Sequence, residues 1–138
     1  MTILLVHAAA TLFMTGLIWF VQVVHYPMFA SVGADALAAY AQRHSSLTGW
    51  VVGPVMLIEL ATAIALVADT SVPRWMSWTG AALLAAVWLS TALLQVPRHA
   101  ELARGFDPVA HGSLVATNWI RTIGWSLRAL LSMAMLSR

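Results

Sequence analysis

Residues 48–68 read TGWVVGPVMLIELATAIALVA, an apolar run in which Glu59 is the single ionisable residue. The hydrocarbon core of a bilayer is about 30 Å thick, and a helix needs about 20 mostly apolar residues to cross it. Such a segment crosses as a helix, because in lipid its backbone polar groups must bond to one another. The run therefore predicts a transmembrane helix, and a carboxylate inside it indicates a functional site.

Residues 3–26, 76–97 and 114–136 have the same length and apolar character. Hydrophobic residues make up 61% of the chain and charged residues 9%, whereas a soluble domain carries about 25% charged residues. The chain is therefore predicted to be all-α: an integral membrane four-transmembrane-helix bundle, with a single membrane domain over residues 1–138. We expect a multi-pass protein of a bacterial inner membrane, surrounded by lipid, and a homo-oligomer is compatible with the sequence.

The connections between these segments carry the helix-breaking residues. Pro27 and Gly33 are predicted to interrupt the first helix, and residues 34–44 to form a short amphipathic helix at the membrane interface. The first apolar run lacks a basic start and is too long for a signal peptide, so we interpret it as a retained helix.

Composition and motifs exclude several function classes. The seven basic residues are all arginines and are scattered along the chain, which argues against a nucleic-acid partner. The chain has no cysteine, so disulfides, thiolate metal sites and cysteine nucleophiles are excluded. It has no Gly-rich phosphate loop and no H-E-x-x-H motif. A lipophilic small molecule is the partner that fits best.

Two helix ends carry similar sequences. The first helix ends in QVVHYP, with Gln22 and His25, and the third ends in QVPRH, with Gln95 and His99. Each is followed by a polar connection with a further histidine and then by another helix. This pattern indicates two helix–loop–helix repeats related by an axis along the membrane normal.

Four histidines are predicted to lie at one membrane face, because each flanks a helix end on the side of the long connections: His25, His44, His99 and His111. Glu59 lies eleven residues after Thr48, about 16 Å deep at helical rise. Imidazoles with one carboxylate form the ligand set of a divalent transition metal such as iron, copper or zinc. The metal ligands are predicted to be His25, His44, Glu59 and His99.

Other polar residues extend this predicted site. Gln22 and Gln95 would orient the cofactor ligands, and Asn118 and Arg121 are the residues predicted to bind a substrate oxygen. His111 is a candidate fifth ligand or catalytic residue. A haem held by two histidines, and metal-free acid–base chemistry, are alternatives.

Structural roles are the competing interpretation of two charged residues. Glu59 and Arg121 would then form an ion pair between the second and fourth helices. Arg128 is expected to extend its side chain to the lipid headgroups.

The C-terminal half resembles the anthrone-oxygenase-like (DUF1772) family of small four-helix membrane proteins, of which this chain would represent a histidine-rich subgroup. The resemblance rests on Val96-Pro97 between polar residues, on Leu102, and on the run NWIRT at 118–122. It implies oxidation of polycyclic anthrones by molecular oxygen without a classical cofactor, with Asn118 and Arg121 in the site. The additional histidines depart from that pattern and favour a metal-dependent mechanism.

The sequence thus predicts an integral membrane oxidoreductase or oxygenase of a hydrophobic small molecule, with a His/Glu metal site near one membrane face. The alternatives are a small membrane carrier or transporter, which would use the same cluster as a transient metal or proton site, and a haem- or quinone-binding electron-transfer module.

Overall fold

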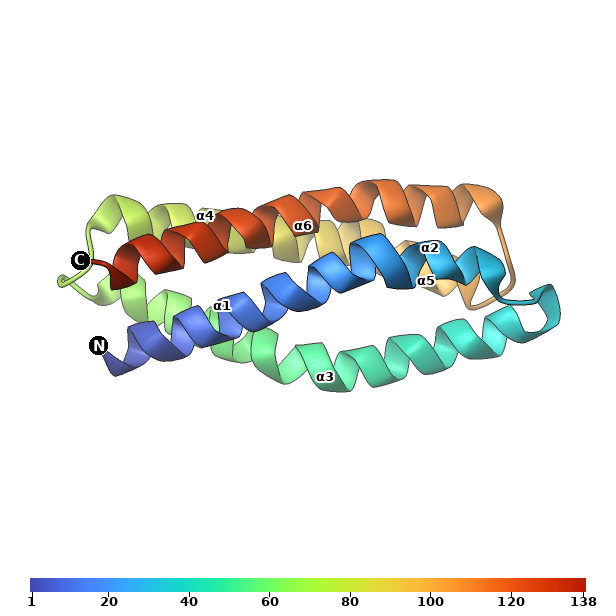
Figure 1. Cartoon of the computed structure of the whole chain (residues 1–138), viewed down its shortest axis with the longest axis horizontal. Coiled ribbons are helices and arrows are strands. Elements are labelled where there is room, and N and C mark those ends of the chain that lie inside the picture. Colours follow the sequence, from blue (N-terminus) through green and yellow to red (C-terminus); the bar gives the residue numbers. More distant parts are fainter.

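The computed structural model describes all residues, 1–138, and contains only helices. Four long helical segments lie side by side as an elongated bundle (Figure 1), which confirms the predicted all-α bundle. The elements in chain order are α1 (Thr2–Phe20), η1 (Val21–His25), α2 (Tyr26–Met28), η2 (Phe29–Ser31), α3 (Ala34–Ala68), α4 (Arg74–Ser90), η3 (Thr91–Gln95), α5 (Val96–Leu102) and α6 (Pro108–Leu136).

Successive segments run in opposite directions. Both chain termini and the α3–α4 turn lie at one end of the bundle, called here the terminal end (Figure 1). The connections at residues 32–33 and 103–107 lie at the other end, called here the loop end. α1 packs against α3 and α6, and α4 packs against α6 and less extensively against α3.

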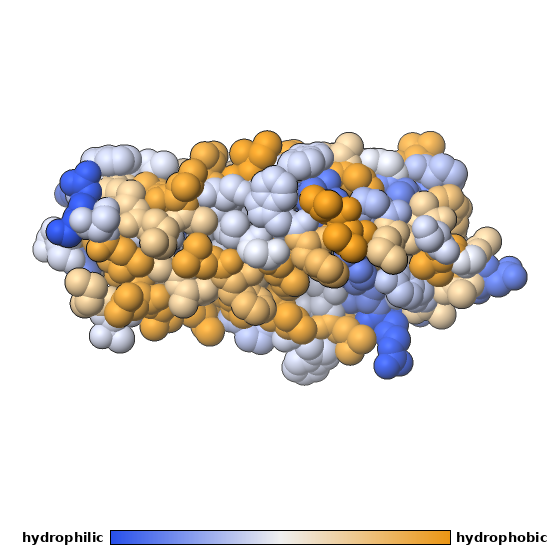
Figure 2. Space-filling model, viewed as in Figure 1, coloured by the Kyte–Doolittle hydropathy of each residue, from blue (hydrophilic) through white to orange (hydrophobic).

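Three of the four segments are long and apolar enough to cross a membrane, judged by length and composition: Thr2–Ser31, Ala34–Ala68 and Arg74–Leu102. α6 has 29 residues but does not meet the same criterion. Its two central arginines, Arg121 and Arg128, are buried against the other helices. Figure 2 shows hydrophobic side chains over much of the visible side of the bundle.

Pro27 does not end the first helical segment, which continues to Ser31. A five-residue π-helical turn, η1, directly precedes Tyr26-Pro27, and a second one, η3, directly precedes Val96-Pro97. A proline inside a helix lacks its N–H and collides with the carbonyl one turn earlier. A wider π turn relieves that collision, so both segments remain helical through their prolines.

The predicted separate helix over residues 34–44 is not separate. Those residues form the first part of α3, a single helix of 35 residues. Residues 45–47 contain no helix breaker, and Pro54 is accommodated inside the helix. α6 also starts earlier than predicted, at Pro108, because the Asp107 carboxylate accepts a hydrogen bond from the Val109 N–H at 2.8 Å and caps the helix.

Candidate functional site

Three of the predicted site histidines meet at the loop end. His25 at the end of η1 and His44 of α3 are joined by a 2.8 Å hydrogen bond between Nε2 and Nδ1. The ring of His99, from α5, lies 5.3 Å from that of His44, and its Nε2 is 2.8 Å from the Tyr26 hydroxyl. These four residues are called the histidine cluster below.

Aromatic packing holds these rings in place. Phe29 is fully buried and meets His25 and His44 edge-on, with ring centroids 5.3 and 5.2 Å apart. Tyr40 meets Phe29 edge-on from α3. Edge-to-face contacts at these distances are favourable, so the imidazoles have a defined orientation around an apolar support.

A cavity of about 490 Å³ lies beside the histidine cluster, between α3 and the η3–α5 segment. Tyr26, His44, Gln95, His99 and Arg121 contribute its polar wall. Two buried atoms of this wall, His99 Nδ1 and Arg121 Nε, have no hydrogen-bond partner. Buried polar groups are nearly always paired, so two unpartnered atoms on the wall of one cavity make that cavity the candidate ligand site.

The cavity opens at the side of the bundle. Gln42, Ser45 and Gly49 of α3 and Val96 and Ala100 of α5 line it and are exposed. Ser45, Gly49 and Ala100 are small residues, and Gln42 has a polar side chain. No atom lies within 4 Å of the place where a Cβ of Gly49 would be. Ser45, Gly49 and Ala100 therefore leave the side of the cavity open, while the Gln42 side chain donates to the Ala103 carbonyl at 3.2 Å.

Arg121 enters the cavity from α6. Its guanidinium carbon lies 5.5 Å from the centroid of the Trp125 ring, a distance at which a cation is attracted to an aromatic face. Trp125 is fully buried and lies one helical turn further along α6. Stacking on Trp125 thus directs a positive charge toward the cavity.

The two glutamines predicted to orient cofactor ligands are both buried, one in each π turn. The Gln22 side chain donates to the Val115 carbonyl at 3.1 Å and accepts from Asn118 at 2.9 Å. Gln95 accepts from Ser90 at 3.0 Å. Gln95 lines the cavity, while Gln22 and Asn118 tie η1 to α6, with the side-chain oxygen of Asn118, Oδ1, left without a partner.

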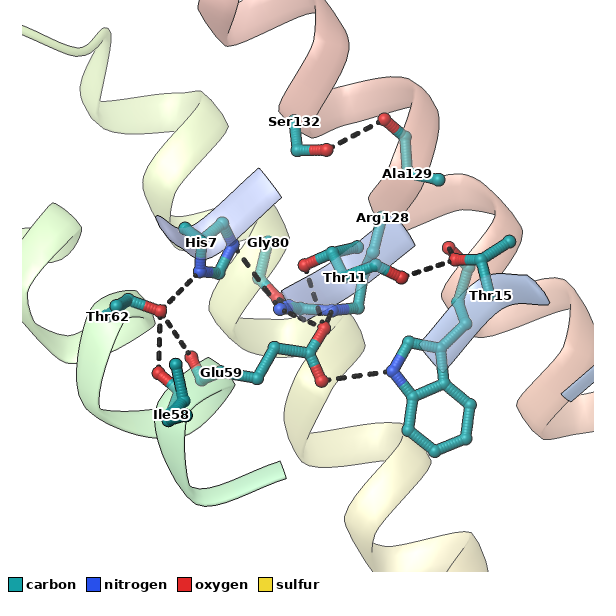
Figure 3. A network of polar contacts seen from close by, with 11 residues as sticks. His7, Thr11, Thr15, Ile58, Glu59, Thr62, Gly80, Arg128, Ala129 and Ser132 are labelled. Atoms are coloured by element: carbon teal, nitrogen blue, oxygen red, sulfur yellow. Dashed lines mark hydrogen bonds and ion pairs between the residues drawn. The ribbon is translucent and has the colours of Figure 1, made fainter. Parts of the chain in front are cut away.

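Glu59 is not part of the histidine cluster. It lies in a second buried polar group (Figure 3), nearer the terminal end, where Arg128 Nη2 is 3.0 Å and Arg128 Nε 3.1 Å from the same carboxylate oxygen. Thr11 donates to this carboxylate at 2.9 Å and the Trp125 indole at 3.0 Å. We call His7, Thr11, Glu59, Trp125 and Arg128 the ion-pair cluster.

The ion-pair cluster joins all four helical segments. Arg128 also donates to the Gly80 carbonyl of α4, and its Nη2 lies 3.4 Å from Nε2 of His7 in α1. His7 Nδ1 is 2.8 Å from the Thr62 hydroxyl of α3. Both oxygens of the Glu59 carboxylate accept hydrogen bonds, so Glu59 and Arg128 form an internal ion pair whose carboxylate has all its partners within the protein.

Two sequence-based expectations are corrected here. The ion-pair partner of Glu59 is Arg128 and not Arg121. Arg128 does not reach toward headgroups, because its side chain is 1% exposed and bonds inward. The signal was present in the sequence: α3 and α6 end at the same end of the bundle, and Glu59 and Arg128 lie at similar distances from those ends.

The structure does not bring the four predicted metal ligands together. Glu59 is bonded to Arg128, and the facing nitrogens of His25 and His44 bond to each other. No group of three or more His, Cys, Asp or Glu side chains is positioned to hold a metal ion. His111 lies outside the cavity, and its Nε2–H donates to the Tyr26 backbone carbonyl at 2.8 Å, which ties α6 to α2.

Comparison with protein families, curated proteins and solved structures found no match to this chain. The resemblance to anthrone oxygenases stays a prediction from the quoted residues.

Proposed function

We propose that this chain is an integral membrane enzyme that binds a lipophilic small molecule by an oxygen atom and moves a proton to or from it. Three helices of membrane-crossing length and an apolar exterior support the membrane location. In this proposal α6 is the fourth transmembrane helix, because its arginines face inward. The two π turns, each with a buried glutamine and a following proline, support two helix–loop–helix repeats.

The observation that carries the proposal is the cavity wall in which His99 Nδ1 and Arg121 Nε are buried and unpartnered. Arg121 would stabilise a phenolate, enolate or carbonyl oxygen of the substrate, as positioned cations stabilise developing oxyanions. In the tautomer in which His99 Nε2–H donates to the Tyr26 oxygen, Nδ1 carries a lone pair. His99 would then act as the general base.

The resemblance to anthrone oxygenases supports an oxidoreductase as the reaction class. Removing a proton from a carbon acid such as anthrone leaves an electron-rich enolate. Molecular oxygen adds to that carbon and is reduced to a hydroperoxide, and loss of water from the hydroperoxide gives the quinone. The side opening between α3 and α5 supports a lipophilic substrate, which would enter from the bilayer. No step of this proposal passes through a metal or a haem.

Anthrone binding and oxygen uptake by the purified protein test the proposal. Binding is measured by quenching of tryptophan fluorescence and turnover with an oxygen electrode. Substituting the proposed base, His99→Gln, should lower turnover about 10²–10⁴-fold. Arg121→Met should lower both affinity and turnover because it removes the charge beside the substrate oxygen.

The cavity opening offers a matched pair of variants. Gly49→Leu should raise the dissociation constant for anthrone at least tenfold, because a larger side chain would close the opening. Gly16→Leu on α1 should leave it unchanged, since Gly16 is equally free of neighbours and lies away from the cavity. Equal binding by both variants and by the wild type would refute the site.

The same samples address the predicted cofactor. Element analysis and an absorption spectrum of protein purified without chelators measure bound metal and haem. A stoichiometric metal or a Soret band, lost in His25→Ala and His99→Ala, would replace the acid–base proposal with a metal- or haem-dependent one.

A further inference from the structure

A second cavity of about 580 Å³, called here the apolar groove, lies between α3 and α4 toward the terminal end. Ten residues line it and all are hydrophobic. Two tryptophans, Trp78 and Trp88, and two small residues, Ala63 and Ala85, are among them. The groove exists because α4 packs less extensively against α3 than against α6.

The apolar groove and the polar cavity lie one after the other along the same helical segments, with α3 on one side and α4, η3 and α5 on the other. On α3, residue Gly49 and Val52 line the cavity and Leu60 and Ala63 line the groove. Each pair is spaced by three residues and the two pairs are eight residues apart, so all four residues lie toward one side of α3. On the facing segment the groove ends at Leu89 and the cavity begins at Thr91.

No charged residue lines the apolar groove, and the cationic Arg121 lines only the cavity. A polar, cationic cavity followed along the same helical segments by a groove lined only by hydrophobic residues matches an amphiphile with one polar head and a long tail. On α3, Met56 lies between the two linings and packs against the buried core, and its flexible side chain is the one that a tail passing from the cavity to the groove would displace.

We infer that the substrate of the proposed reaction is an oxygen-bearing head with a long apolar tail, the head in the cavity and the tail in the apolar groove. This inference rests on the proposed function and specifies its substrate class. The groove extends along α4 from Leu89 to Trp78, roughly 16 Å at helical rise, which accommodates roughly a dozen methylene groups.

The test uses methyl and dodecyl 4-hydroxybenzoate, two phenols with the same head and different tails, bound to the full chain in lipid nanodiscs. Ala85→Trp should fill the groove and raise the dissociation constant of the dodecyl ester at least tenfold without changing that of the methyl ester. Ala86→Trp is the matched control, because Ala86 is exposed on the same helix outside the groove. Partitioning into the bilayer cancels, since each ester is compared between variants at one lipid concentration.

Ile64→Trp repeats the test from the α3 wall, where Ile64 lines the groove and is 64% exposed. Unchanged binding of the dodecyl ester in both groove variants would overturn the inference. If these variants instead change the oligomeric mass, the groove receives a second copy of the chain. If native mass spectrometry shows that the groove variants lose only a bound phospholipid, the groove receives membrane lipid. Either a change in oligomeric mass or the loss of a phospholipid alone would also overturn the inference.

Failure of the proposed function has a different signature. In that case Arg121→Met would leave binding of the methyl ester unchanged, whatever the tail dependence. If binding of the methyl ester depends on Arg121 but Ala85→Trp has no effect on binding of the dodecyl ester, the proposed function is retained and the tail site is rejected. Absence of binding of either ester to the wild type would overturn both.

Discussion

Substituting Arg128 by methionine should destabilise the protein strongly. The change removes both guanidinium contacts to the Glu59 carboxylate, the donor to the Gly80 carbonyl and the contact to His7. Glu59 is fully buried, so only Thr11 and the Trp125 indole still donate to an unneutralised carboxylate. Removing one partner of a buried ion pair costs about 3–5 kcal/mol. We expect Arg128→Met to lower the free energy of unfolding by that amount, measured by SDS titration in bicelles.

The surface pair Arg98–Glu101 is the internal control. It has a similar N–O distance, 2.8 Å, but both side chains are 39% exposed, so Arg98→Met should cost about 0.2–1 kcal/mol. The double variant Glu59→Leu with Arg128→Met should be more stable than Arg128→Met alone, because no unpaired charge remains. A cost for Arg128→Met no larger than that for Arg98→Met, or no recovery in the double variant, would refute the role given to the ion-pair cluster.

Two further predictions concern packing and a loop carboxylate. A Cβ on Gly124 would lie 2.6 Å from Val87 Cγ2, so Gly124→Ala should lower the unfolding free energy by about 1–3 kcal/mol through overpacking. Gly112→Ala is the control: its Cβ meets no neighbour, so this substitution should raise the unfolding free energy by up to about 1 kcal/mol. The Ser71 backbone N–H donates to Asp69 and lowers the pKa of that carboxyl, so NMR should show Asp69 titrating below free aspartate, and the associated stabilisation should be lost as pH falls through the folded-state pKa. Ser71→Ala keeps that N–H and should retain a lowered pKa, and an ordinary value would contradict the assignment.

Hydropathy and length were enough to predict four helical segments, because an apolar run of about 20 residues has few alternatives to a helix. The helix ends were less predictable. Pro27 was expected to interrupt the first helix and Pro97 to be the last residue of the third, but each follows a π turn that makes room for its ring. Residues 34–44 were expected to form their own helix because they are amphipathic, yet amphipathicity does not determine whether two adjacent helical stretches are continuous.

The histidine cluster shows which features of a site can be predicted from the amino-acid sequence. That His25, His44 and His99 lie at one end followed from the direction of each helix. Their partners depend on the rotation of each helix about its axis, which hydropathy does not specify. Arg121 and Arg128 are seven residues apart on one side of α6, so the helix face alone could not distinguish them as partners for Glu59, and only their different distances from the end of α6 could.

Trp125 connects the two polar clusters, and this gives the ion-pair cluster a consequence for the candidate site. The indole N–H of this fully buried residue donates to Glu59, and its ring lies beneath the guanidinium of Arg121. The orientation of the indole is therefore determined by a carboxylate that Arg128 and Thr11 also hold. An arginine in a cavity of about 490 Å³ has many side-chain conformations available. Stacking on a ring that is held at its other edge restricts those conformations, so the buried ion pair helps to orient the charge that would bind the substrate.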